Sequence, residues 1–207
     1  AAQWYRKAKH QGHVQAQFYL GVCYENGVGV PENLQSAVAC YLQAAEQGHA
    51  EAQYNLGICL TRGEGIAKDD EQALYWFEKA ARQGHEEARF YVITRSAKNG
   101  SPAGQYALGV LYEKGLGVSQ DLEKAIVAYR AAAEAGHADA QFELGRRYLN
   151  GEGLRKNSAH AISWLEKAAA QDHAKASSLL KIQQAIGPFW SPGTFATWQK
   201  ILGKNSL

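Results

Sequence analysis

Histidine is the residue type in this sequence whose spacing most directly suggests chemistry, because imidazole is a common metal ligand. One histidine opens each of a series of related segments, in four cases directly after a glycine. Zinc–nitrogen bonds are about 2.0–2.1 Å long, whereas equivalent positions of neighbouring helical repeats lie roughly 10 Å apart. We therefore predict no metal site and expect structural turn residues that bond backbone groups at helix ends. These histidines are His13, His49, His85, His137 and His173.

Paired glycines resemble a phosphate-binding loop but lack its other parts. Such a loop continues into Lys-Ser or Lys-Thr and opens a helix. The pairs in this sequence precede no such residues and follow a segment with helical periodicity. We interpret them as turns that need the backbone freedom of glycine. The pairs begin at Gly27, Gly63, Gly115 and Gly151.

Ser178 and Lys181 have the Ser-x-x-Lys spacing of penicillin-recognising enzymes. Ser-Asp-Asn and Lys-Thr-Gly motifs complete the site in those enzymes, and neither occurs in this sequence. A pattern with two fixed positions arises readily by chance. Because no acid–base pair, nucleophile–base pair or cofactor motif is evident, we predict no catalytic residue and no cofactor.

The three cysteines are Cys23, Cys40 and Cys59. An odd number prevents a complete intramolecular disulfide framework, and the absence of CxxC spacing argues against zinc. At least one thiol is then free or pairs elsewhere. Since Cys23 and Cys59 hold the same position of successive segments, among apolar neighbours, we interpret the cysteines as small core residues.

Composition argues against two classes of partner. The chain has 46% hydrophobic and 20% charged residues, and its formal net charge is +2. Because acidic and basic residues are interspersed, the sequence as a whole offers no attraction to phosphate. No run reaches the roughly 18 apolar residues of a membrane-spanning helix. We predict a globular protein that neither binds nucleic acid nor inserts into a membrane.

A period of 36 residues organises the elements that must position these side chains. Small and apolar residues recur at helical spacing within each period, as at Ala52, Leu56 and Leu60. A second helical segment follows the glycine turn, so each copy predicts two helices. Neither helix can bury its apolar face alone, and we expect the stacking of successive pairs to form the core. Four full copies span 12–47, 48–83, 100–135 and 136–171.

Residue types at the helix ends and between the helices support this interpretation. A glycine in the left-handed conformation ends the first helix, and a good N-cap residue starts the second. Small residues let helices approach, and large rings fill the gaps between pairs. The predicted N-caps are Asn33, Asp69, Asp121 and Asn157, and the predicted gap-filling rings are Tyr41, Trp76, Tyr129 and Trp164.

The runs Ala50–Gly57, Gly63–Ile66 and Ala73–Ala81 closely resemble the Sel-one-like repeat, and related runs cover nearly the whole chain. The resemblance implies a tetratricopeptide-like, all-α fold: a right-handed superhelical α-solenoid of antiparallel helix pairs with a concave protein-binding surface. Relatives serve as adaptors in bacterial signalling, envelope and host-interaction processes. The resemblance therefore implies a non-catalytic scaffold whose partner is another protein.

The alternative function, an enzyme or small-ligand binder, follows from cysteine-rich relatives to which β-lactamase-like activity has been attributed. Those relatives staple each repeat with a disulfide, and this chain lacks the cysteine pairing. A bacterial periplasmic or secreted location is favoured, with the cytoplasm as the alternative. The chain begins at Ala1 and contains no Met, so we expect a processed end or a boundary within a longer protein. We expect a monomer or a weak homo-oligomer.

Three segments depart from the period. Residues 1–11 resemble only the second helix of a repeat, so we expect the array to continue upstream. Residues 84–99 form a shortened copy without the glycine turn. Either one continuous helix fills it and inverts or breaks the stack, or two very short helices preserve direction, unless residues are missing from the sequence. Residues 172–207 are predicted to form C-terminal capping helices and a tail.

One stripe of the first helix in each copy is the candidate binding surface. If Ala52 and Leu56 face the core, residues beside them at i, i+3 and i+7 spacing point elsewhere. In tetratricopeptide-like folds this stripe lines the groove, and rigid aromatic side chains are good binding anchors. The alternative is that these rings pack as core. The candidate stripe residues are Phe18, Val22, Glu51, Tyr54, Ile58, Arg62, Phe90, Tyr106, Val110, Lys114, Phe142 and Arg146.

Overall fold

The computed structural model describes residues 3–5 and 13–186 of the 207-residue chain. Every regular element in these residues is a helix, which confirms the all-α prediction. No helix in the described part is long and apolar enough to cross a membrane. The chain divides into two compact units, Ala1–Asn99 with Leu111–Gln120, and Gly100–Val110 with Asp121–Leu207.

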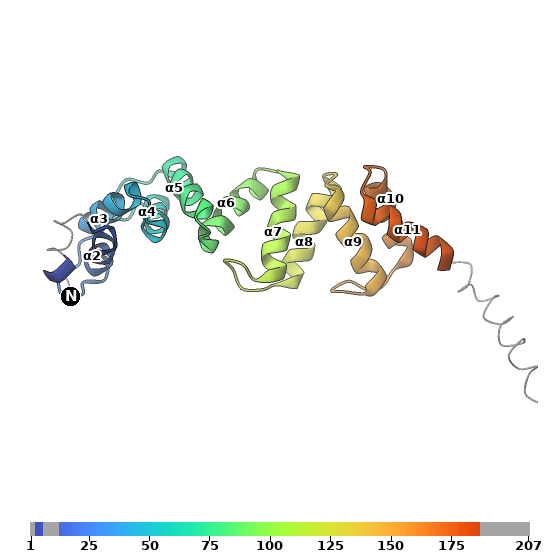
Figure 1. Ribbon diagram of the computed structural model, residues 1–207, viewed down its shortest axis with the longest axis horizontal. Coiled ribbons are helices and arrows are strands. Elements are labelled where there is room, and N and C mark those ends of the chain that lie inside the picture. Colours follow the sequence, from blue (N-terminus) through green and yellow to red (C-terminus); the bar gives the residue numbers. More distant parts are fainter. Residues whose placement is uncertain (1–2, 6–12, 187–207) are drawn as a thin grey trace, which may run out of the picture. The chain divides into compact units, whose positions relative to one another are not determined.

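In the first unit each helix packs on the next one along the chain: α2 on α3, α3 on α4, α4 on α5 and α5 on α6 (Figure 1, blue to green). This is the stacking that a helical solenoid requires, because no single pair buries both of its faces. The helices span Val14–Asn26 (α2), Leu34–Glu46 (α3), Ala50–Arg62 (α4), Asp70–Arg82 (α5) and Glu86–Lys98 (α6).

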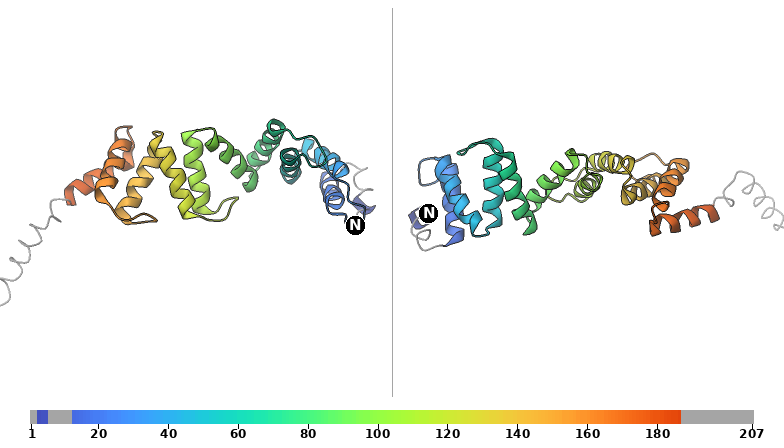
Figure 2. Two further views of the ribbon diagram at one scale, coloured as in Figure 1. Left: turned by 180° about the vertical axis from the view of Figure 1, so that it is seen from behind. Right: turned by 90° about the horizontal axis from the view of Figure 1, so that it is seen from above.

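The second unit repeats the arrangement, with α8 packed on α9, α9 on α10 and α10 on α11 (Figure 2). The helix α7, Pro102–Lys114, contributes residues to both units, since the division falls after Val110. The remaining helices span Leu122–Glu134 (α8), Ala138–Asn150 (α9), Ser158–Ala169 (α10) and Ala174–Ile186 (α11). Of the predicted cap, residues 187–207 lie outside the described residues.

Capping residues set the helix ends where the sequence predicts them. Asn33 Oδ1 accepts a hydrogen bond from the Ser36 amide at 2.8 Å, at the start of α3. Asp69, Asp121 and Asn157 cap α5, α8 and α10 in the same way. Each satisfies an amide that has no partner within its own helix. The four N-cap predictions are confirmed.

The glycine turns have two separate requirements. Gly63 ends α4 at φ 73°, in the left-handed region that favours glycine, and its amide bonds the Cys59 carbonyl. Gly65 also has a positive φ, and a Cβ added there would lie 2.4 Å from the carbonyl oxygen of Leu34, the first residue of α3. The second glycine is therefore needed for close contact with the preceding helix as well as for its backbone conformation.

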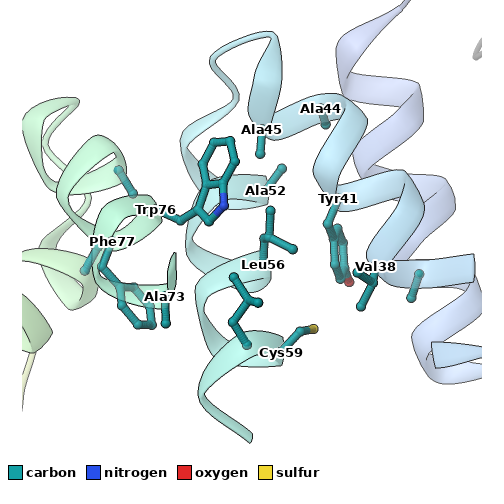
Figure 3. Close-up of a cluster of buried hydrophobic side chains, with 14 residues drawn as sticks. Val38, Tyr41, Ala44, Ala45, Ala52, Leu56, Cys59, Ala73, Trp76 and Phe77 are labelled. Carbon is teal, nitrogen blue, oxygen red and sulfur yellow. The ribbon is translucent and has the colours of Figure 1, made fainter. Parts of the chain in front are cut away.

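Core packing in the first unit centres on α4. Leu56 is 1% exposed and lies between Tyr41 of α3 and Trp76 of α5 (Figure 3). A Cβ on Gly57 would lie 2.8 Å from the ring of Phe77, which is fully buried. The glycine of each Leu-Gly pair thus makes room for a large side chain of the following helix.

One large side chain in each full copy packs against the glycine of its Leu-Gly pair. Tyr41 and Tyr129 press against Gly21 and Gly109, as Phe77 does against Gly57. In the fourth copy the equivalent side chain is that of Leu165, against Gly145. The residues in this position are therefore Tyr41, Phe77, Tyr129 and Leu165, and the contact lies within each copy. Trp164, predicted to fill a gap between pairs, is half-buried. Trp76 is buried, beside this position.

A glutamine pair links the first helix of a copy to the end of the second. Gln47 Nε2 donates to Gln17 Oε1 at 2.7 Å, and the Gln83–Gln53 and Gln171–Gln141 pairs match it at 2.7 and 2.9 Å. The donor is missing in the third copy, where Ala135 stands in its place. As a result the buried Oε1 of Gln105 has no hydrogen-bond partner in the described residues.

The shortened copy forms one continuous helix, α6, which is the first of the alternatives that the sequence left open. Its first turn matches the other first helices, with His85 as N-cap and a fully buried Ala88. Its first residue also makes the close contact with a turn glycine that the first residue of α3 makes in the same unit. A Cβ on Gly117 would lie 2.3 Å from the Glu86 carbonyl oxygen, as one on Gly65 would from that of Leu34.

Candidate functional site

The apolar members of the predicted stripe are neither core nor fully exposed. In the first unit Phe18, Val22, Tyr54 and Ile58 are half-buried and pack against the buried cluster around Leu56. Glu51, Arg62 and Lys114 are exposed, and Phe90 is half-buried. One side of these apolar residues therefore packs inward while the rest meets solvent, and their role as a binding surface stays a prediction.

A histidine from 31 residues later covers one face of each ring in the full copies. Tyr54 stacks on His85 with ring centroids 4.4 Å apart, and Phe18 stacks on His49 at 4.7 Å. In the second unit Tyr106 and Phe142 stack on His137 and His173 at 4.7 and 4.8 Å. Stacking fixes the ring orientation and adds to burial. These four rings of the stripe are thus held in fixed orientations.

The histidines are positioned by the helix ends that they cap. His85 Nδ1 accepts from the Ala88 amide at 3.3 Å, and Nε2 lies 3.3 Å from a carboxylate oxygen of Glu51. Because a carboxylate only accepts, the Nε2 proton donates in this pair. His49 and His173 likewise cap α4 and α11, accepting from Ala52 and Ala176. The prediction that the histidines bond backbone groups is confirmed for these three.

The other histidines differ in detail. His13 and His137 occupy the N-cap positions of α2 and α9 without a side-chain hydrogen bond to the backbone. Among the described residues no group of three or more His, Cys, Asp or Glu side chains is placed to hold a metal ion. Cys23, Cys40 and Cys59 are all buried, and no disulfide joins them.

Burial favours the neutral forms of the His49 ring and the Tyr54 hydroxyl. It lowers the pKa of His49 below its usual 6.5, although Glu51 opposes this shift in part. Burial also raises the pKa of Tyr54, and the carboxylate of Glu87 adds to the effect. At neutral pH these rings therefore offer apolar surface and hydrogen bonds, but no charge, to a partner.

Phe90 is the exception to the stacking rule. The shortened copy places no histidine 31 residues after it, because position 121 is Asp121. Its ring instead meets Tyr112 edge to face, with centroids 5.6 Å apart. Phe90 therefore has different surroundings from Phe18 and Tyr54, although its position in the repeat pattern is the same.

In the second unit the stripe carries a charged cluster. Arg146 follows Phe142 by one turn and donates to Glu143 at 3.1 Å and to Glu152 at 2.6 Å. Hydrogen bonds from Asn150 and Arg146 lower the pKa of Glu152. Val110, in the equivalent position to Arg146, is half-buried. Arg146 is thus held by its own carboxylates, unlike the aliphatic residues at this position in other copies.

Two hollows open beside the stripe in the second unit. Tyr106 and Phe142 both line the smaller one, of about 280 Å³, together with His173. The larger, of about 1100 Å³, is bounded by α9, α10 and α11, and Phe142 and Arg146 are part of its wall. The structure therefore brings Tyr106, Phe142 and Arg146 together around concave surface.

Sequence reasoning missed several residues of the larger hollow. Leu149, Ile162, Leu179 and Ile182 provide apolar surface there. The lysines that line it are Lys156 and Lys175. They come from three helices and one loop, and no periodic signal links them.

Most of the chain matches a known repeat family. The model of the Sel1 repeat matches residues 1–13, 14–49, 50–85, 102–137 and 138–173. No curated protein matches the sequence significantly. The repeat match covers the stripe and the histidines that stack on it, except for Phe90.

Several solved structures are similar in fold. A protective antigen of uropathogenic Escherichia coli with an SLR fold shares 31% identity over 88% of this chain, with a TM-score of 0.47. A Sel1 repeat protein from Oxalobacter formigenes shares 30% over 87%, also with a TM-score of 0.47. Helicobacter pylori cysteine rich protein B shares 25% over 72%, with a TM-score of 0.38, and 96% of that chain is covered. The present chain spans 43% and 58% of the first two proteins.

Proposed function

Because this chain belongs to the Sel1 repeat family, whose members in general mediate protein–protein interactions, we propose that it is a non-catalytic scaffold that binds a partner protein through the stripe. The observation that carries the proposal is that a histidine holds one face of the half-buried rings within each unit, Phe18 and Tyr54 in the first and Tyr106 and Phe142 in the second. A pre-oriented aromatic side chain loses little conformational freedom on binding, so it makes an efficient anchor.

Aliphatic and charged neighbours complete the proposed surface. Ile58 follows Tyr54 by one turn of α4 and is half-buried, while Glu51 and Arg62 are exposed beside it. Apolar anchors surrounded by polar groups are the usual arrangement of a protein interface. The solved relatives with printed sources are bacterial, and the proposal includes a bacterial adaptor role in signalling, envelope or host-interaction processes.

Two steps test the proposal. The intact protein is first used to capture partners from its native source, with Arg62→Glu as a surface variant that should reduce capture. Affinity for a captured partner is then measured by calorimetric titration with Tyr54→Ser, Ile58→Ala and Tyr106→Ser combined. We expect a loss of more than about 2 kcal/mol, since a few anchors dominate most interfaces. Unchanged affinity in a folded triple variant would remove the stripe as the binding site.

The control addresses the contacts that these rings make within the protein. Leu56→Ala weakens the core but leaves the stripe side chains and their histidine partners in place. If binding is lost only through a weaker fold, this control loses as much affinity as the triple variant. Circular dichroism on the same samples reports the helix content of each.

A further inference from the structure

The larger hollow in the second unit combines apolar surface with two lysines that form no ion pair among the described residues, and we infer that it binds an amphipathic, acidic segment of the partner protein. The inference rests on the proposed function and specifies the chemistry of what is bound. Ile162 and Ile182 are 37% and 52% exposed although both are large and apolar, and Phe142, Leu149 and Leu179 lie with them around the hollow. Contiguous exposed apolar surface of this kind marks an interaction site.

The size of the hollow favours a chain segment over a small molecule. Its volume of about 1100 Å³ is at least that of a large small-ligand pocket, but the hollow is open to solvent, whereas such pockets enclose most of their ligand. Walls made by α9, α10 and α11 leave a groove between helices, which is the setting in which amphipathic helices bind.

Charge determines which segment fits. Lys156 and Lys175 line the hollow, and neither has an acidic partner in the part of the chain that the structure describes. The acidic groups nearby are already engaged: Glu143 and Glu152 bind Arg146, and Asp139 lies 3.2 Å from His173. The two lysines are thus the charges left to meet a partner, and they favour carboxylates.

The positions of the lysines strengthen this argument. A cation near the start of a helix is disfavoured by the helix dipole, which favours anions there. Helices α10 and α11 carry no Asp or Glu in the first turn, a feature that they share with α2, α3 and α7. Lys156 directly precedes the N-cap of α10, and Lys175 lies in the first turn of α11. Carboxylates of a bound segment would meet both the lysines and these helix ends.

The test uses the full chain and a fluorescein-labelled helical peptide with leucines at i, i+3, i+4 and i+7 and glutamates on both flanks. A second peptide has lysine in place of every glutamate. Fluorescence anisotropy should show the acidic peptide binding about tenfold or more tightly, with an affinity that falls as salt is added. Lys156→Glu with Lys175→Glu should reverse the preference, and Ile182→Glu should abolish binding. Lys181→Glu, on α11 but outside the hollow, is the matched control and should change little.

Each other outcome overturns a different statement. If the peptide preference does not reverse in the double variant, the charge argument is wrong. If neither peptide binds while partner affinity still depends on Tyr54 and Ile58, the inference fails and the proposed function stands. Trp190 and Trp198 are aromatic residues of the C-terminal segment 187–207; if the peptide binds only after both are replaced by Ala, that segment is the occupant and the inference fails. If peptide binding is intact but the stripe variants leave partner affinity unchanged, the proposed function fails instead.

Discussion

The imidazole of His85 lies face to face with the phenol ring of Tyr54, with centroids 4.4 Å apart and ring planes 25° apart. The two residues belong to different copies, so the contact ties the start of one first helix to the middle of the preceding one. The same pairing recurs three more times at a spacing of 31 residues. The imidazole of His85 therefore both caps a helix and stacks on Tyr54, a ring of the candidate interface.

Leu56→Ala should lower the free energy of unfolding by about 2–5 kcal/mol, because a leucine that is 1% exposed leaves a cavity when it is truncated. Neighbouring helices should be destabilised with it through their shared interfaces. Denaturant unfolding followed by circular dichroism measures the change. Leu42→Ala, at a position that is 37% exposed in the same unit, is the control and should cost clearly less. A loss below about 0.5 kcal/mol at Leu56 would show that α4 does not carry the core.

Ala135→Gln should raise the free energy of unfolding by about 0.5–1.5 kcal/mol, the usual net contribution of a hydrogen bond. The new amide would donate to the Gln105 Oε1, which is buried and lacks a partner. A double-mutant cycle with Gln105→Leu isolates the effect, because the stabilisation should disappear when the acceptor is removed. An equal gain in both backgrounds would mean that the glutamine acts by some other contact.

Stability should fall as the pH is lowered below about 6.5, in part because of His49. Its pKa is below 6.5 in the folded protein and about 6.5 in the unfolded chain. Above pH 6.5 both states are neutral and the full stability is present. Below it the unfolded chain takes up the proton first, so the free energy of unfolding falls until the pH passes the folded-state pKa.

His49→Asn tests this pH dependence, since asparagine can still accept from the Ala52 amide but does not titrate. Urea unfolding at pH 7 and pH 5 should show a smaller loss of stability in the variant than in the original protein. A nuclear magnetic resonance titration of the His49 ring gives the folded-state pKa directly, and a value above 6.5 would contradict the expected sign.

Cys59 should not react with a thiol reagent at pH 8 while the protein is folded. Burial raises the pKa of its thiol to about 11, with further contributions from the carboxylates of Glu25 and Glu64, and the thiolate is the reactive form. Ellman's reagent should release colour slowly from the native protein and quickly once denaturant is added. Glu51→Cys, at an exposed position, supplies a thiol that should react at once, so a fast reaction without it would indicate an open core.

Helix ends were predictable from sequence because local chemistry sets them. Asn33 and Asp69 cap helices through their own side chains, and Gly63 ends one through its own backbone conformation. The ring against Gly57 was harder to predict, because Trp76 and Phe77 are adjacent aromatics on one helix. Only the glycine opposite decides that Phe77 fills the gap.

The repeat position of Arg147 indicates that this charged residue lies in the core. It holds the repeat position of Cys23, Cys59 and Leu111, all of which are buried, and it is itself 1% exposed with its guanidinium 5.4 Å from the ring centroid of Tyr129. Its charge suggests a solvated residue, whereas its position in the repeat indicates the core. Lys156 and Lys175 carried no such signal, since their shared hollow exists only once three helices have packed.

The single helix α6 of the shortened copy bears on how arrays of such repeats can differ in length. It packs on α5 as the first helix of a copy would, and its first residue contacts Gly117 as the first residue of α3 contacts Gly65. One helix can therefore take over contacts that are normally divided between two. A copy reduced to one helix thus keeps contacts by which full copies stack in this unit, so the length of such an array is not restricted to whole repeats.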